Sequence, residues 1–271
     1  MPSYLVTGAG RGLGYGFLKQ LVLNPENTVF GLTRDADAAR DRLAADGLAS
    51  RVHIVQAEIT SHSSLQRTAK EVEVILGDKG LDVLINNAAY VSEVTAWKSL
   101  VDFEENQDLL INDLQKSVEV NIFGAMRVNY AFLPLIKKGS VKKVLSISSG
   151  MSDIDFINAT KIPVATPYAI SKAGLSTVTA KFNASYHDQG ILFVALCPGN
   201  VDTAEGKQFS KEERHGMQAM GALVAPYAPD WKGPFTPEES AAVCLSRLGQ
   251  LSLEKGHGGV FLSHNGTKKW M

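Results

Sequence analysis

The hydrophobic and polar positions of the chain fall into two alternating patterns. Short apolar runs, bounded by glycine, asparagine or charged residues, predict strands, and between them apolar residues recur at helical spacing. The apolar runs predict strands at 3–7, 28–33, 51–57, 81–85, 141–147, 191–196 and 259–262. The helical spacing of Phe17, Leu18, Leu21 and Val22 predicts a first helix. Further helices are predicted at 35–46, 61–76, 103–136 and 168–187.

The order of these elements predicts the fold class. Residues 81–85 are apolar throughout apart from Asp82, which is typical of a strand covered on both faces. Strands that alternate with helices favour a parallel sheet between two helical layers. No linker, internal repeat or low-complexity segment interrupts the pattern. Residues 1–271 are therefore predicted to form a single α/β domain, a doubly wound seven-stranded parallel sheet with helices on both faces.

A glycine-rich stretch joins the first predicted strand to the first predicted helix. It reads Thr7-Gly8-Ala9-Gly10-Arg11-Gly12-Leu13-Gly14, which fits T-G-x-x-x-G-x-G and not G-x-G-x-x-G. Glycine lets the backbone turn tightly and approach a pyrophosphate, and the helix N-terminus supplies free N–H groups. The stretch predicts a Rossmann-type dinucleotide site, with a flexible turn as the alternative. The expected contacts are Thr7, Gly8, Gly10, Arg11, Gly12, Leu13 and Gly14.

The residues after the second predicted strand indicate which dinucleotide is bound. An acidic residue there would hold the ribose 2′-hydroxyl of NAD, whereas an arginine accommodates the 2′-phosphate of NADP. The strand ends at Thr33 and Arg34 follows it, while Arg11 places a second cation in the glycine-rich stretch. We therefore expect NADP(H). The alternative is that Asp35 holds the ribose and that both arginines are solvated.

Tyr168 and Lys172 are four residues apart in a predicted helix, so their side chains lie on one face. A phenol ordinarily loses its proton near pH ~10, and a fixed ammonium beside it lowers that pKa. Such a pair can exchange a proton with a reacting oxygen. The alternative interpretation of this spacing alone is an exposed helix pair without chemistry.

Composition and charge argue against several other functions. Hydrophobic residues make up 45% of the 271, enough for a sizeable core, and the net charge of −1 provides no basic surface for nucleic acid. Cys197 and Cys244 lie too far apart in sequence to predict a disulfide framework or a metal site. No apolar run has the ~18 residues of a membrane span. Because the first strand begins near residue 3, no room is expected for a signal peptide, and a cytoplasmic, reducing location is predicted.

Six motifs in order resemble the short-chain dehydrogenase/reductase family in its classical form. The resemblance covers nearly the whole chain. Its motifs are Thr7–Gly14, Asn86-Asn87-Ala88, Asn121, Ser149, Tyr168 with Lys172, and Pro198-Gly199-Asn200-Val201-Asp202-Thr203. The C-terminal residues His264-Asn265-Gly266-Thr267 with Trp270 resemble the sniffer-like carbonyl reductase branch.

The resemblance implies four catalytic residues. Ser149 would hydrogen-bond the substrate carbonyl, and Tyr168 would be the general acid in reduction and the base in oxidation. Lys172 would hold the nicotinamide ribose and lower the tyrosine pKa. Asn121 would hold a water molecule in the proton relay. No metal is implied.

The resemblance also implies cofactor contacts beyond the glycine-rich stretch. Asn87 would line the cofactor trough, and Glu58 stands where the family commonly has an adenine-binding aspartate. Thr203 would contact the carboxamide or phosphate end of the cofactor. Further expected contacts are Arg34, Ile59, Ala88, Tyr168, Lys172, Pro198, Gly199 and Val201.

Three departures from the family pattern bear on these assignments. Between Ser149 and Tyr168 there are 18 residues, several more than is usual, so Ser148 is a rival for the catalytic serine. Ser149 follows the predicted strand at the usual offset, and capping or turn chemistry is the alternative for either serine. Ala89 replaces a common glycine, and Glu58 replaces an aspartate while keeping its charge.

Two stretches are candidates for the substrate side. The insert Met151–Pro167 and the segment Ala204–Thr236 both carry apolar side chains, and the second, which also has methionines and aromatic residues, is predicted to be a substrate lid. Tyr90 and Trp97 would add to the same wall. The alternative is that these side chains pack on the body of the protein or on a partner subunit.

These features together predict NADPH-dependent reduction of a hydrophobic ketone or aldehyde, with Tyr168 as the general acid. One alternative is the same fold running alcohol oxidation, imine reduction or another reaction. Another is a redox-silent NADP-binding sensor or scaffold, although such a protein has no need of a proton relay.

The family further implies a homodimer or homotetramer built on the helices 103–136 and 168–187. Small and apolar side chains of the second helix would supply contacts, namely Ala173, Leu175, Val178 and Thr179. The alternative is a monomer.

Overall fold

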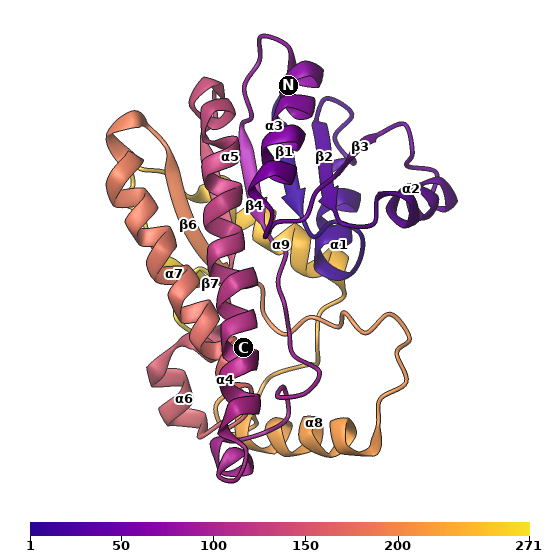
Figure 1. The fold of residues 1–271 in the computed structure, drawn as a ribbon. Coiled ribbons are helices and arrows are strands. Elements are labelled where there is room, and N and C mark those ends of the chain that lie inside the picture. Colours follow the sequence, from indigo (N-terminus) through magenta and orange to yellow (C-terminus); the bar gives the residue numbers. More distant parts are fainter.

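Seven parallel strands form one sheet in the order β3-β2-β1-β4-β5-β6-β7 (Figure 1). The computed structural model describes all residues from 1 to 271. The strands are β1 (Ser3–Thr7), β2 (Thr28–Thr33), β3 (Val52–Gln56), β4 (Val83–Asn86), β5 (Lys143–Ile147), β6 (Leu192–Cys197) and β7 (Phe261–Ser263). Each strand begins and ends within two residues of the predicted position. The predicted fold class is confirmed.

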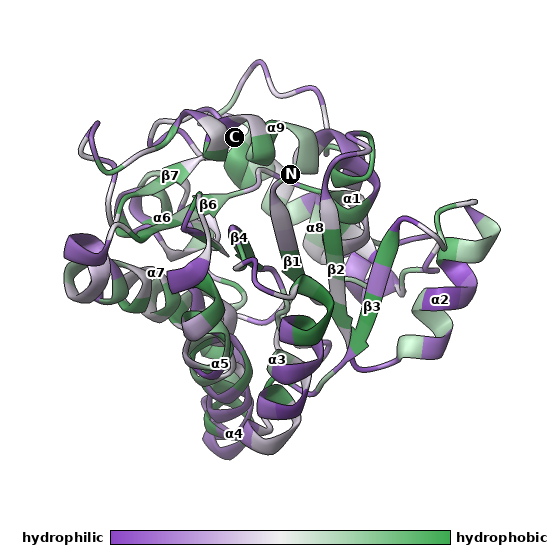
Figure 2. Cartoon of the chain, turned by 90° about the horizontal axis from the view of Figure 1, so that it is seen from above, coloured by the Kyte–Doolittle hydropathy of each residue, from purple (hydrophilic) through white to green (hydrophobic).

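The helices cover both faces of this sheet. They are α1 (Gly12–Leu21), α2 (Ala36–Ala45), α3 (His62–Leu76), α4 (Gln107–Val118), α5 (Ala125–Lys138), α6 (Ile154–Thr160), α7 (Thr166–Tyr186), α8 (Lys211–Val224) and α9 (Pro237–Gln250). Buried residues of α1, α2 and α9 pack with strand residues in a core of 25 residues on one face, and those of α3, α5 and α7 contribute to a core of 22 on the other. Figure 2 shows hydrophilic and hydrophobic segments alternating along α2, α3 and α5, as expected of helices with one buried side.

The predicted helix 103–136 is a helix with a π-helical segment in its middle. Glu119–Gly124 joins α4 to α5 with the wider π turn, and Asn121 lies inside that segment, 1% exposed. A π turn inside an α-helix frequently marks a functional site. The sequence pattern predicted the helix but not this widening.

Three helices fall where the sequence pattern predicted none. The insert after β5 contains α6, the predicted lid contains α8, and α9 fills the stretch before β7. A third core cluster lies near the C-terminus, where Phe156, Val224 and Trp270 pack together. A Cβ on Gly150 would lie 2.5 Å from the Trp270 Cβ, so this packing requires glycine.

The sheet order creates a crevice at one point. Consecutive connections run outward in opposite directions from β1 and β4, which are neighbours, and in such folds ligands bind beyond the carboxyl ends of the strands at this position. The helices give no sign of a membrane span, because none combines sufficient length with sufficient apolar character.

Candidate active site

The glycine-rich stretch forms the turn between β1 and α1. Gly8 has a φ of +67°, which favours glycine, and a Cβ on Gly14 would lie 2.1 Å from the Gly8 carbonyl oxygen. The side chain of Arg11, which precedes helix α1, does not cap it, and the first turn of the helix carries no acidic residue. Its N–H groups and partial positive charge are therefore directed at the crevice. These features fit the pyrophosphate of a nicotinamide dinucleotide.

Thr7 and Asn87 fasten the ends of β1 and β4 together. The Thr7 hydroxyl oxygen accepts from the backbone N–H groups of Asn87 and Ala88, each at 3.0 Å. The Asn87 side-chain amide donates to the Thr7 carbonyl oxygen at 2.9 Å. A Cβ on Gly8 would lie 2.8 Å from the Ala88 Cα. The structure thus brings Thr7, Gly8, Asn87 and Ala88 together. The hydrogen bonds of Asn87 hold the carboxyl ends of β1 and β4 next to each other.

The charged residues after β2 bear on both interpretations of the sequence. Asp35 caps α2, where its carboxylate accepts from the Ala38 N–H at 3.1 Å. Arg34 is 81% exposed and lies 3.9 Å from the Glu58 carboxylate, while Arg11 is also exposed. Both arginines are thus accessible to an anion. The capping bond gives Asp35 a structural role and makes it a poor candidate for the ribose ligand.

Glu58 and Ile59 lie on the side of the crevice where the adenine is expected. The Glu58 carboxylate accepts from the Thr60 N–H at 3.2 Å. Ile59 is 7% exposed, and a Cβ on Gly124 would come within 2.9 Å of its Cδ1 atom. Ile59 therefore packs against the π-helical segment that carries Asn121.

The segment that follows β6 returns to the glycine-rich stretch. The Pro198 carbonyl oxygen accepts from the Ser240 hydroxyl at 2.8 Å, and Gly199 has a φ of +81°. Val201 forms a bridge with Phe235. Thr203 reaches the other side of the crevice, because a Cβ on Gly12 would lie 3.2 Å from its side chain. The expected cofactor contacts from both halves of the chain therefore meet.

Tyr168 and Lys172 lie on one face of α7, as the spacing predicts. The Lys172 ammonium lies 5.6 Å from the centre of the Tyr168 ring and donates to the Ile147 carbonyl oxygen at 2.7 Å. Burial lowers the pKa of Lys172 to about 8. The Lys172 amine is therefore still protonated at neutral pH and loses its proton as the pH rises through about 8.

The phenol of Tyr168 differs from the sequence expectation. Its surroundings are buried, and burial raises its pKa to about 12, whereas its hydrogen bond with Ser149 acts in the opposite direction with a smaller effect. The sequence predicts that Lys172 lowers the pKa of Tyr168, but in the structure this pKa is raised. The physical reason is that desolvation of a phenolate outweighs the favourable contacts. Tyr168 keeps its proton at neutral pH.

The two candidate serines point to different places. The Ser148 hydroxyl is buried and bonds with the Lys172 carbonyl oxygen at 3.2 Å and with the Ser176 hydroxyl at 2.8 Å. The Ser149 hydroxyl accepts from the Met151 N–H at 3.2 Å and contacts the Tyr168 phenol. The geometry favours Ser149 for substrate contact and gives Ser148 a structural position against α7.

Asn121 uses its side chain to hold neighbouring backbone. Its oxygen accepts from the Tyr90 N–H at 2.6 Å, and its nitrogen donates to the Tyr90 carbonyl at 3.0 Å and to the Ser171 hydroxyl at 2.9 Å. The Tyr90 hydroxyl donates to the buried Asp113 carboxylate at 2.8 Å, as does Thr95 at 2.6 Å. Asn121 and Asp113 thereby fix the segment after β4 beside α7. No pattern in the sequence pointed to Asp113.

The two segments predicted to line the substrate side have side chains in two environments. Some pack on the body of the protein, and others line a cavity. Phe156 and Tyr227 meet edge to face at 4.9 Å in the core that contains Trp270, so these two side chains pack on the body. An apolar cavity of about 350 Å³ lies between the insert and α7, and Ala169 and Ala173 line it one position beyond Tyr168 and Lys172. Trp97 contacts α8, because a Cβ on Gly216 would lie 2.8 Å from its ring.

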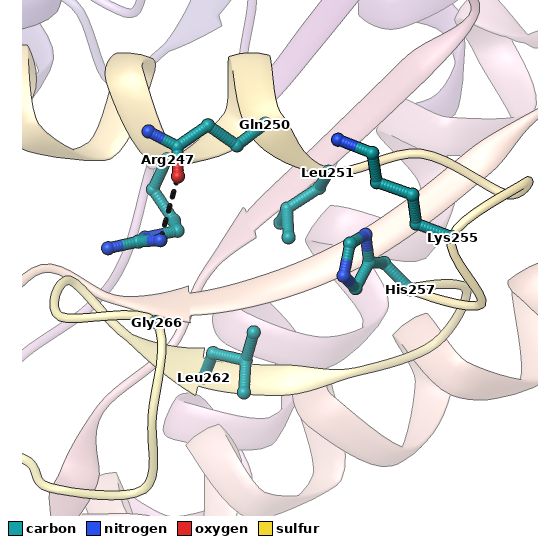
Figure 3. A pocket seen from close by; sticks show the side chains of 7 residues that line it. All are labelled: Arg247, Gln250, Leu251, Lys255, His257, Leu262 and Gly266. Atoms are coloured by element: carbon teal, nitrogen blue, oxygen red, sulfur yellow. Dashed lines mark hydrogen bonds between the residues drawn. The ribbon is translucent and has the colours of Figure 1, made fainter.

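A second cavity, of about 300 Å³, lies between the end of α9 and β7. Figure 3 shows Arg247, Lys255 and His257 around it, with Arg247 donating to the Gln250 side chain at 2.8 Å. None of its lining residues belongs to the predicted site. We therefore assign this cavity no role in the chemistry at Tyr168.

Comparisons with known proteins agree with this arrangement. The family model for short chain dehydrogenase matches residues 3–214. The short chain dehydrogenase virK of Hypocrea virens is 41% identical over 273 residues, with 100% of both chains covered. The crystal structure of an NADPH-bound carbonyl reductase from chicken fatty liver is 28% identical, with a TM-score of 0.76 and 98% of each chain covered. Carbonyl reductase Sniffer of D. melanogaster has the same fold, with a TM-score of 0.75, 22% identity and 98% of each chain covered.

The sheet order and the turn between β1 and α1 define a Rossmann-type α/β protein. The chain belongs to the short-chain dehydrogenase family and is an oxidoreductase of that family. The family predicted from the sequence is confirmed.

Proposed function

We propose that this enzyme uses NADPH to reduce a hydrophobic ketone or aldehyde to an alcohol, with Tyr168 as the general acid. The observation that carries the proposal is the position of the Tyr168 phenol, in contact with the Ser149 hydroxyl and beside the Lys172 ammonium. Burial raises the pKa of Tyr168 to about 12, so the phenol holds a proton to donate at neutral pH. Reduction needs a proton donor at the carbonyl oxygen, and a protonated phenol at this position can be that donor.

The side chains around Tyr168 suggest how the reaction would proceed. A bound NADPH would supply the hydride. The Ser149 hydroxyl would donate to the substrate carbonyl oxygen, and the Tyr168 hydroxyl would pass its proton to the same oxygen as negative charge develops there. The Lys172 ammonium, 5.6 Å from the centre of the Tyr168 ring, would stabilise that charge and hold the nicotinamide ribose. Asn121 would keep the wall beside α7 in place.

The choice of cofactor should depend on Arg34. Its guanidinium is 81% exposed, and with Arg11 it would form charge-assisted hydrogen bonds to the 2′-phosphate. We expect NADPH to bind more tightly than NADH and Arg34→Ala to narrow this difference in affinity by about fivefold, since an exposed charge pair contributes about 1 kcal/mol. Direct titration with both cofactors measures this. Arg40→Ala removes an exposed cation of the same helix region and should change nothing, and wild-type preference for NADH would contradict the assignment.

The hydroxyl of Ser149 should contribute to rate, unlike that of its neighbour. Removing one donor to a developing oxyanion typically costs ~10²-fold or more in kcat. We expect a loss of about this size in Ser149→Ala and a much smaller loss in Ser148→Ala, because Ser148 bonds only within the protein. Steady-state kinetics with a shared substrate compares them. Equal losses, or a larger loss in Ser148→Ala, would reverse the choice of serine.

The remaining proposals concern the surroundings of the site. Residues 1–271 would act as one domain in the cytoplasm, and 204–236 would cover an apolar substrate. Phe123, Tyr130 and Ile170 are each at least 45% exposed and offer apolar contacts for a homodimer. Leu175 and Thr179, which the sequence pattern placed at such an interface, instead face the sheet and are at most 3% exposed.

A panel of hydrophobic ketones and aldehydes tests the proposal as a whole. NADPH oxidation with at least one of them, followed by absorbance, is the expected result. NADPH binding without turnover across the panel would favour the redox-silent sensor or scaffold.

A further inference from the structure

The carboxylate of Glu205 occupies a position in the cofactor crevice. One of its oxygens accepts from the Gly12 N–H at 2.9 Å and, in the same place, from the Arg42 guanidinium at 2.8 Å. Gly12 is the first residue of α1, so this N–H is one of those that an anion at the helix N-terminus would use. A carboxylate oxygen at this position stands in for a phosphate oxygen.

Contacts with groups other than Glu205 also position the Arg42 guanidinium beside the glycine-rich stretch. The guanidinium lies 4.0 Å from the centre of the Tyr15 ring and 3.5 Å from the Gly10 carbonyl oxygen. The Tyr15 hydroxyl in turn donates to the Asp46 carboxylate at 2.8 Å, which fixes the ring. The cation therefore lies against the glycine-rich stretch through contacts that do not involve the lid segment.

Glu205 belongs to the segment that connects β6 to α8. Its backbone has a φ of +48°, an uncommon conformation for a residue other than glycine, so neighbouring contacts must hold it there. Two residues further on, the Lys207 ammonium lies 3.5 Å from the Glu93 carboxylate, across the crevice, and 3.0 Å from Glu213. The segment is thus attached on both sides of the crevice.

We propose that Gly12 and Arg42 form an anion site for a cofactor phosphate, and that Glu205 closes this site as an internal competitor. The inference rests on the proposed use of NADPH. Because one phosphate oxygen and one Glu205 oxygen cannot share the position, cofactor binding displaces Glu205 and frees the 204–210 segment. The contact of Glu205 with Gly12 and Arg42 and occupation of the phosphate site therefore exclude each other.

The competition lowers the apparent affinity for the cofactor. A protein that binds only from an open state has its dissociation constant raised by the reciprocal of the open fraction. A partly exposed charge pair such as Glu205 with Arg42 contributes about 1 kcal/mol, which corresponds to about a fivefold effect. Removing the Glu205 carboxylate should therefore tighten NADPH binding about fivefold.

Direct NADPH titration of the full chain tests the proposal. Glu205→Ala is expected to bind NADPH about fivefold more tightly than wild type. Arg42→Ala in the Glu205→Ala background is expected to lose that gain and bind several-fold more weakly than Glu205→Ala alone. Glu212→Gln, which removes an exposed carboxylate from the first turn of α8, is the matched control and should bind like wild type.

The outcomes of these titrations distinguish failure of the Glu205 proposal from failure of the proposed NADPH-dependent function. Unchanged or weaker binding by Glu205→Ala, with clear binding by wild type, overturns the competition and leaves the proposed function intact. Equal binding by Glu205→Ala and the double variant overturns the role of Arg42. Absence of NADPH binding in every protein overturns the proposed function itself.

Discussion

Replacing Tyr168 with phenylalanine is expected to lower turnover by ~10²–10⁴-fold, the usual contribution of a general acid. This corresponds to about 3–5 kcal/mol of activation free energy. The aromatic ring would still pack on α7, so the free energy of unfolding and the affinity for NADPH should remain close to those of wild type. Single-turnover hydride transfer with an accepted carbonyl substrate measures the loss.

The control for this variant is Tyr90→Phe, which removes a phenol that donates to the Asp113 carboxylate beside the same crevice. Its rate should fall much less than that of Tyr168→Phe. Near-normal turnover in Tyr168→Phe would remove this tyrosine from the mechanism and require another proton donor.

Lys172→Met is expected to lower turnover by about 10²-fold and to weaken NADPH binding as well, because the ammonium has two tasks in the proposed mechanism. It would stabilise charge at the reacting oxygen and hold the nicotinamide ribose. Burial lowers the pKa of Lys172 to about 8, and the protonated form is the active one. Activity should therefore be present below pH 8 and fall as the pH rises through about 8.

A pH profile of kcat/KM checks the second prediction. Lys172→Arg, which keeps its charge at every pH measured, should retain part of the activity and lose the falling limb near pH 8. If the limb persists in Lys172→Arg, another group produces it. If Lys172→Met reduces turnover with no change in NADPH affinity, the proposed contact with the ribose is wrong.

The sheet could be predicted from the sequence because its signals are local. Most strands are near-continuous apolar runs, as expected of parallel strands buried on both faces, whereas β3 at the edge of the sheet alternates between buried and exposed residues. The glycine-rich stretch was equally clear, since Gly8 and Gly14 occupy places that a Cβ would fill. The spacing of Tyr168 and Lys172 likewise placed both on one helix face.

Two of the helices that the apolar pattern does not predict have capping signals in the sequence. Thr236-Pro237-Glu238-Glu239 forms a capping box at the start of α9, with proline at a preferred position, and Ser210 with Glu213 forms another at the start of α8. Both were recognisable from the sequence. Helix α6 has seven residues and depends on burial of Phe156 against Trp270, a contact that no local pattern reveals.

The electrostatics of the site could not be predicted, because they depend on residues that are distant in sequence. Glu205 and Arg42 are separated by 163 positions. The pKa of Tyr168 was expected to fall next to Lys172 and instead rises, since its sign depends on how completely the phenol is buried. The spacing of two residues on a helix predicts that their side chains are neighbours. It does not predict how far either side chain is exposed to water.

The most direct test of the central claim is transfer of a labelled hydride. The purified chain would be mixed with NADPH carrying deuterium at the transferred position and with hydrophobic ketones or aldehydes, and the products analysed by mass spectrometry. We predict an alcohol that contains the deuterium in wild type, with its formation slowed by ~10²–10⁴-fold in Tyr168→Phe. Tight NADPH binding with no deuterium in any alcohol, from any carbonyl compound tested, would contradict the account.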